Sequence, residues 1–208
     1  MLNQLGPDIW VVDADTVEVL GFHYPTRMAI IRLADQKLFL WSPTRLDDAL
    51  KQDIDQLGDV AHIVAPNSLH HLFVPAWQDA YPGAKTYAPP GLRSKRPDIS
   101  FDEDLADGGN PDWQGQIDQV VVQGNRITTE VVFFHIASGT VIFTDLIQHF
   151  PEDWFSGWRK FIARLDLMTA PEASVPRKFR LAFTNRKAAR IAVKRILGWP
   201  ASTVLMAH

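Results

Sequence analysis

Residues 61–72 read Ala-His-Ile-Val-Ala-Pro-Asn-Ser-Leu-His-His-Leu and form the most informative segment of the chain. An apolar run stops at Pro66, and a polar segment then ends on two adjacent histidines, His70 and His71. The run predicts a buried strand, and the periodic apolar residues that follow predict a helix. Loops after the strands of open α/β sheets hold functional groups, so the histidine pair is a candidate for metal binding or acid-base chemistry. The alternative is a helix start with two partly exposed histidines.

The composition is that of an ordinary globular protein. The 208 residues are 46% hydrophobic and 22% charged, and no linker divides them, so we expect one domain over residues 1–208. The net charge of -3 argues against nucleic-acid binding. The absence of cysteine excludes disulfides and thiolate chemistry and leaves histidine and carboxylates as the strong metal ligands. With neither a signal-like N-terminus nor a membrane-length apolar run, the sequence predicts a cytoplasmic protein without membrane contact.

Strands and helices alternate along the chain. Strands are expected at residues 9–12, 17–22, 28–33, 37–41, 60–65, 84–88, 119–123, 130–136, 140–144 and 203–206. Helices are expected at residues 44–57, 69–80, 152–165 and 186–197. The strand, helix and strand between residues 60 and 88 imply a parallel crossover, and hence an α/β architecture. Residues 89–115, rich in proline, glycine and aspartate, are interpreted as a long surface excursion and a candidate flap over a site.

Two of the expected helices have marked faces. The helix at 152–165 carries Trp154 and Trp158 on an apolar face, and core packing is the predicted role of both tryptophans. The helix at 186–197 has basic Arg186, Lys187, Arg190 and Lys194 on one arc and Ala189, Ala192, Val193 and Ile196 on the other. We expect the basic arc to be a solvated face. Binding of a nucleic acid or an anionic surface is a lower-ranked alternative, given the net charge of -3.

The candidate chemistry lies at strand ends. The sequence has no phosphate-binding glycine loop and no Gly-x-Ser-x-Gly elbow for a nucleophile. The remaining candidates are potential metal ligands, namely His70, His71, His135, Asp145 and His208. A divalent ion needs about four such groups from different strands, so we expect these five to converge at one edge. Taken singly, each could equally be a core histidine or a capping carboxylate.

The order of several segments resembles the metallo-β-lactamase superfamily, and more closely an uncharacterised bacterial branch of it, a domain of unknown function. These segments are YPTRM at 24–28, LWSP at 40–43, IVAPNSLHH at 63–71, YPGA at 81–84, FFHIAS at 133–138, FTDL at 143–146 and MAH at 206–208. They cover nearly the whole chain in the right order. The resemblance implies a four-layer αβ/βα sandwich, with the N-terminal strands in one mixed sheet and the hairpin at 130–144 in the other.

The superfamily's signature is a His-x-His-x-Asp-His loop after a strand. In this chain Pro66 and Ser68 stand at the first two histidines, His70 at the aspartate and His71 at the last histidine. Both leading ligands are therefore missing, and the resemblance implies a degenerate site.

The resemblance also aligns three later residues with metal ligands of the superfamily, His135, Asp145 and His208. Of the two metal positions in active members, one retains only His135. The other keeps His71, Asp145 and His208 as its core ligands, with His70 as the expected fourth. The implied site holds one divalent ion, zinc in the first place, or none.

Active members of the superfamily use metal-activated water to attack an ester, thioester, lactam or phosphodiester bond. With the degenerate site, the resemblance implies at most a slow single-metal hydrolase of an unknown small molecule. The alternative is a non-catalytic binding or structural protein that kept the fold and lost the metal. If an ion binds, its occupancy is expected to fall below about pH 6.5, the free-histidine value, because a ligating imidazole must be neutral.

Overall fold

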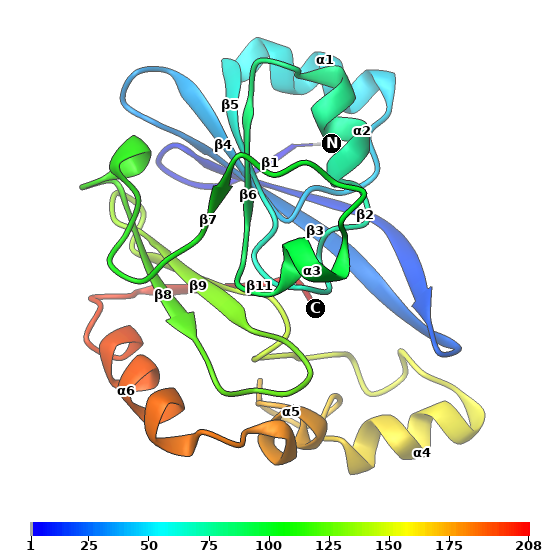
Figure 1. Cartoon of the computed structure of the whole chain (residues 1–208). Helices are drawn as coiled ribbons and strands as arrows, with labels where there is room; N and C mark the ends of the chain where they lie inside the picture. The colour runs from blue at the N-terminus through cyan, green and yellow to red at the C-terminus, as the bar shows by residue number, and fades with distance from the viewer. Residues whose placement is uncertain (1) are drawn as a thin grey trace.

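Two mixed β-sheets lie face to face in the computed structural model, which describes residues 2–208 (Figure 1). The larger sheet runs in the order β1 (Asn3–Gly6), β2 (Ile9–Val19), β3 (Phe22–Arg32), β4 (Lys37–Trp41), β5 (Asp59–Val64), β6 (Lys85–Ala88) and β7 (Glu103–Asp104). The smaller sheet has the order β11 (Thr203–Met206), β10 (Thr140–Phe143), β9 (Glu130–His135) and β8 (Ile117–Val122). The predicted division of the strands between two sheets is confirmed.

Helices form the outer layers. They are α1 (Asp48–Leu57), α2 (Val74–Ala80), α3 (Leu92–Lys95), α4 (Gly157–Leu165), α5 (Arg177–Ala182) and α6 (Arg186–Ile196), with a short 3-10 helix, η1 (Pro111–Trp113). In Figure 1, α1 and α2 lie above the larger sheet and α5 and α6 lie below the smaller one. The predicted αβ/βα sandwich is therefore confirmed. No helix within residues 2–208 is long and apolar enough to cross a membrane.

The core between the two sheets draws on both halves of the chain. Phe39 of β4 and Phe133 of β9 meet across the gap with ring centroids 5.6 Å apart, and both are fully buried. Two further apolar layers lie outside, one between the larger sheet and α1 and α2, the other between the smaller sheet and α6. Burial of both faces of each sheet accounts for the near-continuous apolar runs of the strands.

The first hairpin differs from its prediction. The sequence predicts separate strands at 9–12 and 17–22, but β2 and β3 pair along their whole lengths, with a shift in register between Ala14 and Thr16, and turn at Leu20 and Gly21. Both turn residues have positive φ, 52° and 80°, as a two-residue type I′ turn requires. Asparagine or glycine usually precedes the glycine in such a turn, so leucine gave no turn signal.

Residues 89–115 are not a flap. They form α3, β7 and η1, and they bury Ile99, Phe101, Leu105 and Trp113. The Trp113 ring lies 4.9 Å from the ring of Phe39, inside the core between the sheets. The acidic and proline-rich composition of this segment hid its buried apolar residues, and the interpretation as a surface excursion was wrong.

Two helices begin at later residues than the sequence predicts. α1 begins at Asp48 rather than near residue 44, because the side chain of Asp47 caps it by accepting a hydrogen bond from the backbone N–H of Leu50, at 2.7 Å. α2 begins at Val74, so His70 and His71 lie in the loop before it and not on its first turn.

The two helices with marked faces behave in opposite ways. α6 buries Ala189, Ala192 and Ile196 and leaves its basic residues exposed as predicted, although Val193, expected on the buried arc, is 45% exposed. In the α4 region, Trp154 and Trp158 are 40% and 56% exposed, so the prediction that both pack in the core was wrong.

Candidate metal centre

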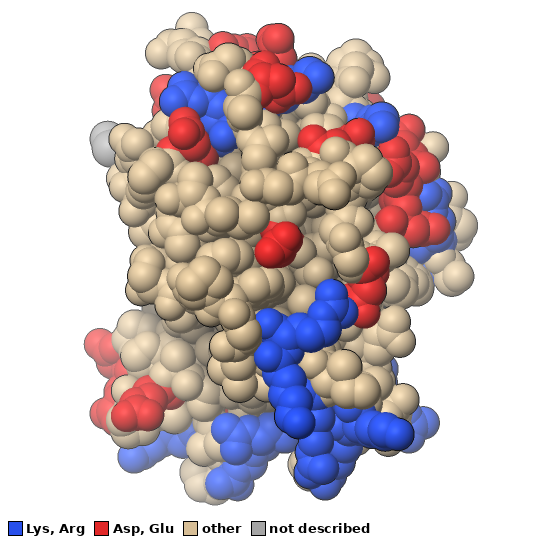
Figure 2. Space-filling view, turned by 90° about the vertical axis from the view of Figure 1, so that its left-hand side faces the viewer, with Lys and Arg blue, Asp and Glu red and all other residues tan. Residues whose placement is uncertain are grey.

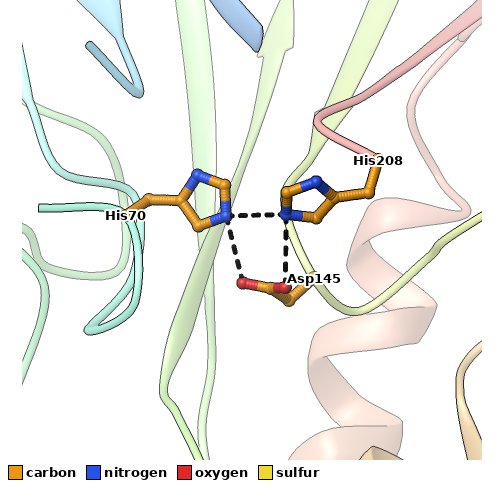
Figure 3. A group of neighbouring side chains, drawn as sticks. All are labelled: His70, Asp145 and His208. Atoms are coloured by element: carbon orange, nitrogen blue, oxygen red, sulfur yellow. Dashed lines mark hydrogen bonds and ion pairs between the residues drawn. The ribbon is translucent and has the colours of Figure 1, made fainter. Parts of the chain in front are cut away.

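Three of the five predicted ligands meet at one edge of the sandwich, and they come from three separate segments. Strands β10 and β11 are parallel with Phe143 opposite Met206, so the residues that follow them, Asp145 and His208, emerge side by side. His70 arrives from the loop after β5. Figure 3 shows the three side chains pointing toward one another.

The three ligand atoms form a small triangle. His70 Nε2 lies 3.1 Å from His208 Nε2 and 3.3 Å from Asp145 Oδ2, and His208 Nε2 lies 3.6 Å from Asp145 Oδ1. The exposed fractions of the side chains are 12% for His70, 7% for Asp145 and 5% for His208. Within residues 2–208 this is the one group of three or more histidine or acidic side chains close enough to share an ion.

The orientation of His208 is determined by its second ring nitrogen. Nδ1 donates a hydrogen bond to the backbone carbonyl of Pro25 on β3, at 2.9 Å, so a neutral ring presents the unprotonated Nε2 to the triangle. The rings of Tyr24 and Phe150 contact the imidazole, with centroids 5.4 Å and 6.1 Å away. Burial lowers the pKa of His208 to about 4, against the opposing effect of Asp145, and keeps the ring neutral at ordinary pH.

His70 is placed by a turn and by a serine. The side-chain oxygen of Asn67 accepts hydrogen bonds from the backbone N–H groups of Leu69 and His70, at 2.8 and 2.9 Å, as in an Asx turn. His70 Nδ1 lies 2.8 Å from the hydroxyl of Ser42, the residue after β4. Ser42 has a left-handed φ of 53° and is buried. A strained, buried serine on the outer nitrogen of His70 is typical of residues that orient functional groups.

Two side-chain amides hold the carboxylate of Asp145. Asn67 Nδ2 donates to Oδ2 at 2.7 Å, and Gln148 Nε2 donates to Oδ1 at 3.1 Å. Burial alone would raise the pKa of Asp145, but the His70 and His208 imidazoles and the Asn67 amide hold it well below its usual value. The carboxylate is therefore ionised, although it is almost fully buried.

Glu130 supports this edge, and sequence reasoning missed it. Its fully buried carboxylate accepts hydrogen bonds from the backbone N–H groups of Thr144, Asp145 and Leu146, at 2.9, 2.8 and 3.0 Å. Burial and the nearby Asp145 charge raise its pKa. The signal was a single carboxylate at the start of the apolar run Glu130–His135, where a buried acid needs partners.

His135 does not join the cluster. β9 runs antiparallel to β10, with His135 opposite Thr140 and so at the turn end of the hairpin, while Asp145 follows the other end. Along β9, His135 lies roughly 17 Å from Glu130, at 3.3 Å per residue. Its Nδ1 is 2.8 Å from the Ser138 hydroxyl, and burial lowers its pKa. His135 is a buried core histidine, and the expectation that it reaches the site was wrong.

His71 also points elsewhere. The guanidinium of Arg96 donates to His71 Nδ1 at 2.7 Å, and the same guanidinium pairs with Asp98. Burial, with the charges of Lys95 and Arg96, lowers the pKa of His71 to about 4. Because adjacent residues in a loop project in different directions, His70 takes the place in the cluster that we expected of His71.

The cluster fits a divalent ion. Tetrahedral zinc with ligands at about 2.1 Å spaces its ligand atoms about 3.4 Å apart, close to the three distances of the triangle. A backbone carbonyl on His208 Nδ1, a hydroxyl on His70 Nδ1 and two amides on the carboxylate are the kind of outer partners that metal ligands have. Within the described residues, the buried Gln148 Oε1 has no hydrogen-bond partner, which leaves an acceptor free beside the ligand set.

Comparisons with known proteins agree with this architecture. The profile of a family described as "Domain of unknown function (DUF4336)" matches residues 7–207. No curated protein matches the chain.

Three solved structures each align with the whole chain. A metal-soaked Flv1 flavodiiron core from Synechocystis sp. PCC6803 has 13% identity and a TM-score of 0.66, and this chain spans 55% of it. A metallo-β-lactamase from Pontibacter korlensis has 11% identity and a TM-score of 0.66, with 90% of that chain covered. The metallo-β-lactamase FIM-1 from Pseudomonas aeruginosa, in its mono-zinc form, has 14% identity and a TM-score of 0.62, with 87% covered. At these identities the likeness shows the fold.

Proposed function

This chain belongs to the family described as a domain of unknown function (DUF4336) and has the metallo-β-lactamase fold, and from that premise we propose that it binds one divalent metal ion, zinc in the first place. The ligands are His70, Asp145 and His208, and the observation that carries the proposal is their triangle of 3.1, 3.3 and 3.6 Å. FIM-1 in its mono-zinc form shows that a protein of this fold can hold a single ion.

Without a bound ion, the hydrogen bonds of the cluster require a proton on Nε2 of His70, at the centre of the triangle where the ion would bind. His208 Nε2 can only accept, because Nδ1 of that ring donates to Pro25, so His70 Nε2 must donate across the 3.1 Å contact. His70 Nδ1 then accepts from the hydroxyl of Ser42. For His70 to ligate through Nε2, the proton of the ring must move from Nε2 to Nδ1, and Ser42 must change from donor to acceptor.

This exchange gives the proposal a direct test. Zinc titration calorimetry of the metal-stripped protein, in two buffers of different ionisation enthalpy near pH 7, is expected to give one ion per chain and no net proton release, because a neutral imidazole keeps its one proton when it changes tautomer. His70→Ala is expected to abolish binding, and His71→Ala, which removes the adjacent histidine outside the cluster, to leave it unchanged. Unaltered zinc binding in His70→Ala, or its loss in His71→Ala, would refute the assignment.

Any hydrolysis at this site is expected to be slow. A bound ion would supply Lewis-acid activation of water, the chemistry typical of the fold. The chain's own residues supply one carboxylate and two neutral imidazoles, and the low exposure of all three leaves limited access for a substrate. The side-chain oxygen of Gln148 is buried beside these three ligands, and it is free to accept a hydrogen bond from a polar group of a bound molecule.

The alternative function is a non-catalytic binding or structural role, and the low exposure of the three side chains favours it. Hydrolysis of a panel of activated esters, thioesters, lactams and phosphodiesters by zinc-loaded protein separates the two roles. The hydrolase is supported if activity is present in the wild type and in His71→Ala but lost in His70→Ala. Zinc binding without activity on any of these classes would favour the binding role.

A further inference from the structure

Helix α4 turns its apolar face away from the protein. Trp158, Phe161, Ile162 and Leu165 follow the i, i+3, i+4, i+7 spacing of one stripe, yet they are 56%, 66%, 42% and 50% exposed. Ala163 is fully buried and lies roughly 150° around the helix from the centre of the stripe, at 100° per residue. An amphipathic helix in a globular protein normally does the reverse, so the stripe needs a partner outside the fold.

A second exposed apolar element lies beside α4. At the tip of the β2–β3 hairpin, the Gly21 carbonyl accepts a hydrogen bond from Arg159, and the rings of Phe22 and Trp158 meet edge to face at 5.5 Å. Leu20 at this tip is 92% exposed and has a φ of 52°, a conformation that favours asparagine or glycine. Both its exposure and its backbone conformation disfavour leucine there, so a contact outside the chain accounts for it best.

The surrounding charge is strongly positive, although the whole chain is acidic. Residues 156–208 carry eleven Lys and Arg against two acidic residues, a net charge of +9. Residues 1–155 carry ten Lys and Arg against 22 acidic residues, a net charge of -12. Figure 2 shows Lys and Arg gathered at the lower end of the molecule, where Figure 1 places α5 and α6. The net charge of -3 therefore conceals a marked separation of charge along the molecule.

We propose that this end of the molecule docks on a lipid bilayer rich in anionic headgroups. The tip of Leu20 and the α4 stripe of Trp158, Phe161, Ile162 and Leu165 would enter the interface, and the basic side chains of α4, α5 and α6 would contact the headgroups. The absence of a spanning helix from residues 2–208 agrees with peripheral binding. The inference goes beyond the metal site and does not rest on it.

Other occupants fit less well. A second copy of the chain would bring two ends with a net charge of +9 together. A nucleic acid would suit the charge and could stack on Trp158 and Phe161, but it offers no apolar surface to the exposed aliphatic residues Leu20, Ile162 and Leu165. The sequence alone predicted no membrane contact, and it is the outward orientation of α4 that changes this expectation.

Flotation of the full chain with vesicles tests the proposal. Binding is expected to phosphatidylcholine vesicles that contain phosphatidylglycerol and not to phosphatidylcholine alone, and added salt is expected to weaken it. Tryptophan fluorescence is expected to shift to the blue on binding, because Trp154 and Trp158 are exposed in the free protein.

Three variants sharpen the test. Leu20→Asn is expected to lower binding about tenfold, since one leucine no longer enters the apolar interface. It is also expected to leave stability unchanged or raise it, because asparagine suits the turn. Phe161→Ser with Leu165→Ser is expected to abolish binding. Leu72→Asn, at a leucine 58% exposed ahead of α2, is the matched control and is expected to bind like the wild type.

The proposal fails if folded wild-type protein does not bind anionic vesicles, or if the α4 and Leu20 variants bind as tightly as Leu72→Asn. It also fails if the α4 stripe is instead needed for dimerisation or for salt-sensitive binding to a DNA duplex.

Discussion

The two ends of the β9–β10 hairpin bury polar side chains in contrasting settings. At the open end, Glu130 accepts a hydrogen bond from the backbone of Asp145, and the carboxylate of Asp145 meets His70 and His208, which come from two further segments of the chain. At the turn end, His135 has only its neighbour Ser138 as a side-chain partner among the described residues. The open end gains its partners because β11 runs parallel to β10 and ends beside it, and because the loop after β5 meets the start of β9. Convergence of strand ends, more than burial or residue type, makes one end a candidate site.

The largest effect is expected at Glu130. Glu130→Ala leaves three buried backbone N–H groups without an acceptor and is expected to lower the free energy of unfolding by about 4 kcal/mol. Glu130→Gln keeps one acceptor oxygen and is expected to lose about half as much. Denaturant unfolding of both variants measures these losses of stability. A midpoint for Glu130→Ala equal to that of the wild type would show that Glu130 does not stabilise this edge.

Acidification is expected to have the next largest effect on the open end. In metal-free protein His208 takes a proton at about pH 4, whereas in the unfolded chain it does so near 6.5. Between these values the unfolded state binds more protons, so the stability contributed by neutral His208 is fully present above 6.5 and lost as the pH falls toward 4, by about 3 kcal/mol.

The pKa of His71 is also lowered to about 4, so His71 contributes to the same loss of stability on acidification. The contribution of His208 is therefore obtained by comparing the wild type with a variant that lacks His208. Urea unfolding between pH 4 and 7 is expected to show a smaller loss of stability in His208→Gln than in the wild type. Equal losses would mean that His208 titrates normally in the folded protein.

Substitution at the turn end of the hairpin is expected to have the smallest effect on stability. His135→Gln removes the Ser138 contact and is expected to lower the free energy of unfolding by about 1 kcal/mol, without changing zinc affinity. Parallel unfolding and zinc titration of this variant check both statements. A loss of zinc binding in a folded variant would show that His135 contributes to the metal site, and that the two ends of the hairpin do not differ as described.

Much of the fold was predictable from local patterns. Apolar runs located most strands, and the crossover between β5 and β6 together with the family resemblance indicated the two-sheet sandwich. The turn at Leu20 escaped prediction because leucine is unfavourable there. Hydrophobic periodicity showed that the helix now seen as α4 has an apolar face, but periodicity cannot tell whether that face points inward or outward.

The site was predictable in part. His70, Asp145 and His208 were among the candidates, but the expected core ligand, His71, turns toward Arg96. The exclusion of His135 was already implied by the turn at residues 138–139, because a residue just before a hairpin turn and one well after it lie at opposite ends. The hydrogen bonds that Asn67, Gln148 and Glu130 make to Asp145 could not be read from sequence, since they join positions up to 78 residues apart.

The most direct test of the central claim is anomalous scattering from crystals soaked in zinc at neutral pH. We expect one zinc peak, at about 2.1 Å from Nε2 of His70, Nε2 of His208 and one carboxylate oxygen of Asp145. An empty triangle at saturating zinc, or a peak bound instead by His71 or His135, would contradict the account.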